Sequence, residues 1–154
     1  VERNGRLLKK CVALNEIVVS RGVPISLVTI HLHVGGEPIA TYRADGLIVA
    51  TPTGSTAYSM TVGGPVLPPT SENFIIIPIA PHLCLDRPLI LPGDAEIGLQ
   101  IETKYEGVIT ADGHNNIMLE SGDKITIRKH NRQAAFVRLD PPEYFYRRLL
   151  RRLE

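Results

Sequence analysis

Short apolar runs alternate with turn residues along most of this chain. Two β-strands are predicted first, from Cys11 to Ser20 and from Ile25 to Val34, with a turn at Arg21-Gly22-Val23-Pro24 between them. Gly35-Gly36-Glu37-Pro38 turns the chain again, which predicts a β-meander. The apolar run from Leu47 to Val49 is typical of a strand that is buried on both faces.

Further short strands are predicted in the second half of the chain. They are Phe74 to Ala80, Leu89 to Leu91, Glu96 to Glu102, Gly107 to Ala111, Lys124 to Arg128 and Ala134 to Leu139. Twelve prolines and thirteen glycines punctuate the chain, whereas a doubly wound sheet would need helices between successive strands. The pattern therefore predicts a mainly β fold, a two-sheet β-sandwich-like domain.

Two helices are predicted. A short helix follows the loop Thr51-Pro52-Thr53-Gly54-Ser55-Thr56-Ala57-Tyr58, and a C-terminal helix runs from about Glu143 to Leu153. The apolar face of the second helix consists of Phe145, Leu149, Leu150 and Leu153. Its other face carries Arg147, Arg148, Arg151 and Arg152. Arginines at this spacing usually form a solvated face, and a patch that binds an anion or nucleic acid is the alternative.

The composition is that of an ordinary globular protein. Of the 154 residues, 44% are hydrophobic and 21% are charged, which is enough for one core. The formal net charge of +1 gives no electrostatic argument for nucleic acid. The longest apolar stretch, Phe74 to Ala80, is far too short to cross a bilayer. We therefore expect one domain over residues 1–154, with neither a nucleic-acid nor a membrane partner.

The cysteines and histidines form no metal-ligand pattern. Cys11 and Cys84 lie in apolar, strand-like surroundings, and we interpret them as buried free thiols in a reducing compartment, the cytoplasm. His82 and His114 are far apart in the sequence and lack His-x-x-x-His spacing. No resident metal site is predicted, and no signal-peptide pattern is present.

The segment with the most chemical information joins the buried strand to the short helix. Pro52 cannot donate to a strand ladder and Gly54 admits unusual backbone angles, so the strand ends here. A helix that starts at Ser55 or Thr56 would leave its first amides free to hold a phosphate, a ribose hydroxyl or an adenine nitrogen. The alternative is a plain strand-turn-helix connection in which Thr53 or Ser55 caps the helix.

This segment closely resembles the signature of the NAD kinases. The matching string is Asp45-Gly46-Leu47-Ile48-Val49-Ala50-Thr51-Pro52-Thr53-Gly54-Ser55-Thr56-Ala57-Tyr58-Ser59, followed by Val62-Gly63-Gly64-Pro65. Three further stretches agree in order and spacing: Ala13-Leu14-Asn15-Glu16-Ile17-Val18-Val19 with Arg21-Gly22, Pro78-Ile79-Ala80-Pro81-His82 with Arg87-Pro88-Leu89, and Ala111-Asp112-Gly113. The resemblance spans nearly the whole chain.

One motif of that family is missing. NAD kinases also carry Gly-Gly-Asp-Gly in an N-terminal α/β domain, where the aspartate is thought to act as general base. Here Gly35-Gly36 is followed by Glu37-Pro38, and Gly63-Gly64 by Pro65. We therefore expect residues 1–154 to be the C-terminal, dinucleotide-binding β domain, with the N-terminal domain missing and no catalytic base among its own residues.

The resemblance implies that several polar residues bind NAD. Asn15 and Glu16 would contact the dinucleotide, where a carboxylate can accept from two ribose hydroxyls. Without the resemblance, one of the pair would face solvent and the other would bond to a loop. Asp45 would line the nicotinamide end of the site, often across a subunit boundary. Arg43 would neutralise the pyrophosphate or Asp45, with a surface salt bridge as the alternative.

The adenosine half of NAD would be held by the loop and the short helix. Thr56, Ala57 and Tyr58 match the family residues at this place, and core packing is the alternative for Tyr58. The other implied NAD-binding residues are Ser26, Thr53, Ser59, Thr61, Ala80 and His114. Ser26 matches only by spacing, and His114 stands where many relatives carry glutamine.

The resemblance also implies a reaction. The full-length protein would transfer a phosphoryl group from ATP or polyphosphate to the adenosine ribose 2′-hydroxyl of NAD, giving NADP, with Mg²⁺ on the donor phosphates. The 154-residue chain alone would be inactive, and a homodimer or homotetramer is expected. Two alternatives are a non-catalytic dinucleotide-binding or regulatory β domain and a lipid kinase of the diacylglycerol or sphingosine type.

Overall fold

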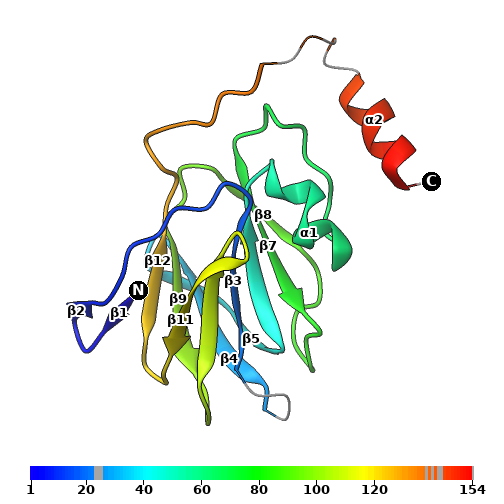
Figure 1. The fold of residues 1–154 in the computed structure, drawn as a ribbon. Coiled ribbons are helices and arrows are strands. Elements are labelled where there is room, and N and C mark those ends of the chain that lie inside the picture. Colours follow the sequence, from blue (N-terminus) through cyan, green and yellow to red (C-terminus); the bar gives the residue numbers. More distant parts are fainter. Residues whose placement is uncertain (23–25, 138, 140, 142–143, 154) are drawn as a thin grey trace.

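Two antiparallel sheets of six strands each form the body of the protein (Figure 1). The computed structural model describes residues 1–22, 26–137, 139, 141 and 144–153. Sheet A has the strand order β2 (Arg6–Leu7), β1 (Glu2–Arg3), β12 (Lys124–Ile127), β9 (Ile97–Glu102), β4 (Val28–Val34) and β5 (Glu37–Ala44). Sheet B has the order β11 (His114–Leu119), β10 (Gly107–Ala111), β3 (Glu16–Arg21), β6 (Gly46–Ala50), β7 (Asn73–Ile79) and β8 (Leu89–Pro92). The predicted mainly β, two-sheet fold is confirmed.

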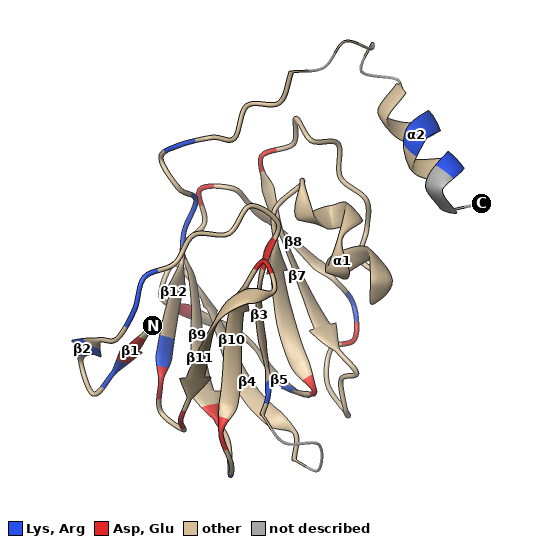
Figure 2. Ribbon diagram, in the orientation of Figure 1, with Lys and Arg blue, Asp and Glu red and all other residues tan. Residues whose placement is uncertain are grey.

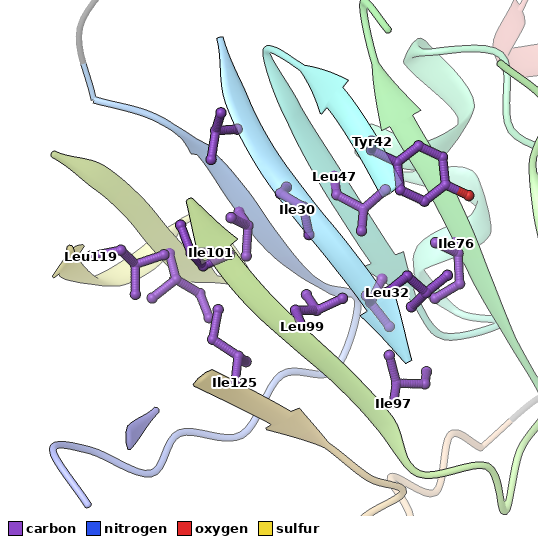
Figure 3. Packing of buried hydrophobic residues seen from close by; sticks show 14 of the residues in the cluster. Ile30, Leu32, Tyr42, Leu47, Ile76, Ile97, Leu99, Ile101, Leu119 and Ile125 are labelled. Carbon is purple, nitrogen blue, oxygen red and sulfur yellow. The ribbon is translucent and has the colours of Figure 1, made fainter. Parts of the chain in front are cut away.

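The core lies between the two sheets (Figure 3). Alternate residues of β4, β9 and β12 point inward, because successive side chains of a strand face opposite sides of the sheet. Fully buried side chains of this core include Ile30, Leu32, Tyr42, Leu47, Ile97, Leu99 and Ile101. Each large apolar side chain buried in this way stabilises the fold by about 1.5–3 kcal/mol.

The middle of sheet B is buried on both faces. Its outer face carries a second apolar cluster formed by Val18, Ile48, Ala50, Ile75 and Ile77. Val62 and Leu67, from the segment that follows the short helix α1 (Tyr58–Thr61), pack against it. All five residues of β6 are therefore buried, as the apolar run from Leu47 to Val49 predicted.

Some of the predicted strand boundaries are wrong. The strand expected from Cys11 begins only at Glu16, because the amides of Leu14 and Asn15 bond to a side-chain carboxylate instead of a strand. The expected four-residue turn after β4 contains only Gly35-Gly36, both with positive φ, and β5 starts directly at Glu37. The turn expected at Arg21-Gly22-Val23-Pro24 lies partly outside the described residues.

Several strands were not predicted. β5 and β11 carry many polar residues, and β1 and β2 are only two residues long, so the apolar pattern gave little signal for them. Conversely, the strand expected from Ala134 to Leu139 is absent from the described part of that segment. Phe136 and Val137 are exposed there, and β12 already has β1 and β9 on its two sides. A strand needs a neighbour with which to form a ladder.

The C-terminal helix is confirmed as α2 (Tyr144–Leu153). Figure 1 shows it beyond the end of the sheets. Phe145 and Leu149 are half-buried, whereas Leu150 is exposed, so the expected apolar face is only partly covered. Figure 2 marks basic positions along α2 in blue, and Arg147, Arg148 and Arg151 are exposed. The side chains of Arg152 and Leu153 and the expected start at Glu143 lie outside what is described.

Candidate functional site

A tight turn between β10 and β11 builds one side of the candidate site. Ala111 pairs with His114, so Asp112 and Gly113 form a two-residue hairpin loop with φ of 49° and 71°. These positive angles are those of a type I′ turn, for which Asp-Gly is a preferred sequence. The turn directs the Asp112 carboxylate at the chain that enters β3.

Asp112 accepts three hydrogen bonds from consecutive backbone amides. Its Oδ2 accepts from Leu14 N–H at 2.6 Å. Its Oδ1 accepts from Asn15 N–H at 2.8 Å and from Glu16 N–H at 3.0 Å. The backbone of the predicted Asn15-Glu16 pair is thus fixed by a side chain from the neighbouring hairpin.

Thr51, at the end of β6, holds the same segment from the other side. Its hydroxyl donates to the Leu14 carbonyl at 2.6 Å and accepts from Gly54 N–H at 3.1 Å. Its own amide donates to the Asn15 carbonyl at 2.8 Å. A Cβ atom added at Gly54 would overlap that carbonyl, so glycine is required for this close approach.

Glu16 has a buried carboxyl group with a raised pKa and, among the described residues, an unpaired oxygen. The residue is 7% exposed, and its Oε2 has no hydrogen-bond partner among the described residues. Burial raises the pKa of the Glu16 carboxyl, and the negative charge of Asp112 raises it further. A buried carboxylate oxygen without a donor is costly. A ligand hydroxyl or amide would remove that cost.

The loop after β6 differs in detail from the predicted strand-turn-helix. A 3₁₀ turn, η1 (Gly54–Thr56), precedes α1, which is a single turn. The amides of Gly54, Ser55 and Ala57 already donate hydrogen bonds within the loop. These three N–H groups are therefore not free to bind a ligand, contrary to the prediction. The proposed side-chain caps are also wrong, because Thr53 makes no capping bond and the Ser55 hydroxyl bonds to Pro52 and Leu67.

The predicted adenosine-binding residues differ in exposure. Tyr58 is 41% exposed on α1, so the core-packing alternative for its ring does not hold. Thr61 is also exposed, and Thr53, Thr56 and Ala57 are half-exposed. Ser59 is fully buried, with no partner for its hydroxyl among the described residues, so a ligand could reach it only after a local shift.

A second group of predicted residues lies at the other end of the sheets. Asp45 connects β5 to β6, and its carboxylate forms a two-pronged ion pair with Arg21, Nε to Oδ1 at 2.9 Å and Nη2 to Oδ2 at 3.0 Å. The expected partner Arg43 is exposed on β5 instead. Ala80 is exposed after β7, next to the Asp45 amide, which donates to the Ile79 carbonyl. Ser26 precedes β4 at this end.

The two groups are separated by the length of β6. Glu16 pairs with Ala50 and Ser20 with Gly46, so Asn15-Glu16 and Asp45 lie at opposite ends of the same ladder. Five residues of antiparallel strand span about 17 Å. One chain therefore brings together Asn15, Glu16, His114 and the loop from Thr53 to Thr61, but not Arg43, Asp45, Ala80 or Ser26.

Sequence reasoning missed three residues that organise these groups. Asp112, Thr51 and Arg21 were noted only as parts of matching strings. The Asp-Gly pair between two apolar runs is a hairpin signal that could have located Asp112. The partners of Thr51 and Arg21 are far away in the sequence, so no local pattern reveals them.

The remaining polar features lie elsewhere. A hollow of about 450 Å³ on the outer face of sheet A is lined by residues that include His31, His33, Thr41 and Glu102. Within the part of the chain that is described, no three His, Cys, Asp or Glu side chains are placed to hold a metal ion. Among the described helices none has the length and apolar character needed to span a membrane.

The two cysteines are free thiols, but the prediction that they are buried is wrong. Cys11 and Cys84 are half-exposed, because both precede or follow strands instead of lying within them. Cys84 still packs against the edge of the core. The cytoplasmic location inferred from these residues stays a prediction.

Comparison with known proteins adds an independent line of evidence. Residues 14–139 match the family model described as the ATP-NAD kinase C-terminal domain. An NAD kinase from Chloroflexus aggregans is 40% identical over 151 residues, covering 98% of this chain and 55% of that protein. An NAD kinase from Dehalococcoides mccartyi is 41% identical over 136 residues, 88% of this chain and 48% of that protein. The chain thus spans about half the length of these relatives.

Solved structures agree with the sequence matches. The crystal structure of an NAD kinase from Archaeoglobus fulgidus in complex with ATP superposes with a TM-score of 0.80 at 34% identity, covering 90% of this chain and 54% of that one. Yeast NADH kinase complexed with NADH superposes with a TM-score of 0.70 at 36% identity, covering 74% and 33%.

Proposed function

The chain belongs to the NAD kinase family, and from this premise we propose that it binds NAD as the phosphate acceptor of a kinase that makes NADP. The observation that carries the proposal is the buried Glu16 carboxylate, whose Oε2 lacks a donor among the described residues. The adenosine ribose offers hydroxyl donors, and a carboxylate can accept two of them. Asn15, next to it, can both donate and accept.

The phosphoryl transfer itself needs more than these residues. We propose that the γ-phosphoryl group of ATP passes to the ribose 2′-hydroxyl, with polyphosphate as an alternative donor. About half of each curated relative lies outside the matched region, and we propose that the general base and the donor site come from the corresponding part. Mg²⁺ would arrive on the donor phosphates, which usually supply part of its coordination.

We propose that a second copy of the chain completes the nicotinamide end of the site. Asp45 and Ala80 lie about 17 Å from Glu16 along the β6 ladder, too far to share hydrogen bonds with one ribose. We propose a homodimer in which Asp45 and Ala80 of one copy complete the site built on Asn15, Glu16 and Tyr58 of the other. A homotetramer would repeat this arrangement.

A calorimetric titration of the chain with NAD tests the acceptor site. Tyr58→Ala removes an exposed ring and its hydroxyl, and we expect the NAD dissociation constant to rise about fivefold or more. Tyr105→Ala is the matched control, because Tyr105 is 49% exposed in the β9–β10 loop, outside both groups. Equal affinity of both variants would contradict the proposed site.

Mixing two defective chains tests the shared site. Asp45→Ala and Tyr58→Ala should each weaken binding in every site of a homodimer. In a random mixture, about a quarter of the sites would combine an intact Asp45 with an intact Tyr58. Recovery of tight binding in that fraction is the expected result, and no recovery would count against a site shared by two copies.

Binding and activity tests distinguish the two alternative functions, a lipid kinase and a non-catalytic dinucleotide-binding domain. The relatives reported above are NAD or NADH kinases, which disfavours a diacylglycerol or sphingosine kinase. Binding of NAD but not of a lipid vesicle is the expected result. A non-catalytic dinucleotide-binding domain would bind NAD equally well, but adding a phosphate donor and the remaining part of a full-length NAD kinase relative would give no NADP.

A further inference from the structure

Asp112 has a place in the candidate site but no ligand role in the function proposed above. We propose that Asp112 is a positioning residue of the NAD site, whose carboxylate fixes the backbone of Asn15 and Glu16 so that both side chains face the dinucleotide before it binds. This inference rests on the proposed function, because it deepens the role of the same site.

The geometry of the three amides carries the proposal. The N–H groups of Leu14, Asn15 and Glu16 all converge on one carboxylate, at 2.6, 2.8 and 3.0 Å. Consecutive amides turn to one side only in a bent backbone, which is why β3 starts no earlier than Glu16. Without the carboxylate, these three donors would lose their shared acceptor, and the backbone at residues 14–16 would lose the hydrogen bonds that hold its amides turned to one side.

The carboxylate is itself rigidly placed. Asp112 lies in a two-residue turn, and its amide donates to the Glu16 carbonyl at 3.0 Å. β10 pairs with β3 along its whole length, from Gly107 with Arg21 to Ala111 with Ile17. The hairpin and the Asn15-Glu16 pair therefore move as one unit, and Thr51 secures the other side.

The same contacts argue against direct ligand binding by Asp112. Both of its oxygens already accept hydrogen bonds, so a ribose hydroxyl would have to compete with backbone amides. Glu16 is the opposite case, because its Oε2 has no partner among the described residues. Asp112 thus acts through Glu16 and Asn15.

The turn allows a clean substitution. Asn tolerates positive φ and fits a type I′ turn as well as Asp, so Asp112→Asn should keep the hairpin. Its amide group replaces one acceptor oxygen by a donor that faces backbone N–H groups. Asp112→Gly is the second variant, since glycine also fits the turn and deletes the side chain. Asp94→Asn is the matched control, because Asp94 is exposed in the β8–β9 loop.

Amide hydrogen exchange of the ligand-free chain is the first readout. In Asp112→Asn and Asp112→Gly, exchange at Leu14, Asn15 and Glu16 should accelerate about tenfold or more, because a hydrogen bond to a charged acceptor is lost. Amides of sheet A, such as that of Ile101, should not change. Unchanged exchange at residues 14–16 would overturn the positioning role.

NAD affinity in a double-mutant cycle is the second readout. Asp112→Asn should raise the NAD dissociation constant about tenfold in the wild-type background, but have little effect when Asn15 and Glu16 are both already Ala, because both positioned side chains are gone. Equal effects in both backgrounds would mean that Asp112 acts independently of these two side chains and would overturn the inference. So would an Asp112→Asn chain that binds NAD as tightly as the wild type.

The two readouts separate this inference from the proposed function. A wild-type chain with protected amides at residues 14–16 that binds no NAD at millimolar concentration would overturn the acceptor site and, with it, the positioning for NAD. If the wild type binds NAD and only the Asp112→Asn variant binds it more weakly, the proposed acceptor site is not contradicted. The Asp94→Asn control should match the wild type in both measurements.

Discussion

At the scale of single residues, Glu16 carries a cost to the fold that the proposed ligand would offset. The residue is 7% exposed, and one oxygen of its carboxylate has no partner among the described residues. Two neighbours that could have been donors, the amides of Asn15 and Glu16 itself, are committed to Asp112. Such unsatisfied groups are retained where a ligand supplies the missing bond.

Glu16→Gln should stabilise the ligand-free chain at neutral and alkaline pH. Burial raises the pKa of the Glu16 carboxyl, so the folded chain binds this proton more tightly than the unfolded chain, and ionisation destabilises the fold as pH rises through the folded pKa. Gln removes that penalty, and its advantage should shrink as pH falls below this pKa. Urea unfolding from pH 4 to pH 8 measures the effect.

Glu37→Gln is the matched control for this change. Glu37 is exposed at the start of β5, so its substitution should shift stability by no more than about 0.5 kcal/mol at any pH. A Glu16→Gln variant that is less stable than the wild type at pH 8 would contradict the prediction. The same variant should bind NAD more weakly, because Gln presents only one acceptor oxygen.

At the scale of elements, a partly buried ion pair fastens the first hairpin to the rest of sheet A. Asp123 is fully buried just before β12. Arg3, on β1, donates to its two oxygens from Nε and Nη2, both at 2.8 Å. The Glu120 amide donates to Oδ2 at 2.9 Å. Strands of two residues cannot hold themselves by their ladders alone, so β1 and β2 depend on this anchor.

Asp123→Asn should destabilise the chain at neutral pH. Hydrogen bonds from Arg3, and secondly from the Glu120 amide, hold the pKa of the Asp123 carboxyl below its usual range. The stabilisation is therefore complete above the unfolded pKa of about 3.9 and is lost as pH falls through the folded pKa. The gap between wild type and variant should accordingly narrow towards acid, in urea unfolding from pH 7 to pH 3.

Asp94→Asn serves as the control here too, because an exposed carboxylate contributes little to stability. If Asp123→Asn unfolded at the same urea midpoint as this control at pH 7, the ion pair would contribute nothing to stability. Hydrogen exchange at the amides of β12 would locate the loss, since β12 lies between β1 and β9.

At the scale of the whole molecule, stability resides in the layer between the sheets. Ile101 is fully buried at the centre of this core, on β9 (Figure 3). Ile101→Ala should lower the free energy of unfolding by about 2–5 kcal/mol, through lost burial and the cavity left behind. Urea unfolding measures this loss in the free energy of unfolding and compares it with the loss in Ile90→Ala.

Ile90 is the matched control because it is the same residue type, on β8, with 51% of its surface exposed. Its truncation should change stability by no more than about 0.5 kcal/mol. Similar losses for both variants would mean that the inter-sheet layer is not the main core.

The sequence by itself determined the fold class and the family, and it named candidate residues for the site. Apolar runs of strand length, separated by glycine and proline, favour a β architecture. The string from Asp45 to Ser59 carries the family signature. Such features are local in the chain, so no folded structure is needed to read them.

The tertiary structure decided what lies next to what. Polar strands such as β5 and β11 form because a neighbouring strand supplies their hydrogen bonds, and the apolar segment 134–139 has no such neighbour in its described part. The partners of Asp112, Thr51 and Arg21 are brought to them by sheet register. Register also puts Asp45 and Glu16 at opposite ends of β6. Contacts between residues distant in sequence depend on the whole set of strand pairings, which no local pattern encodes.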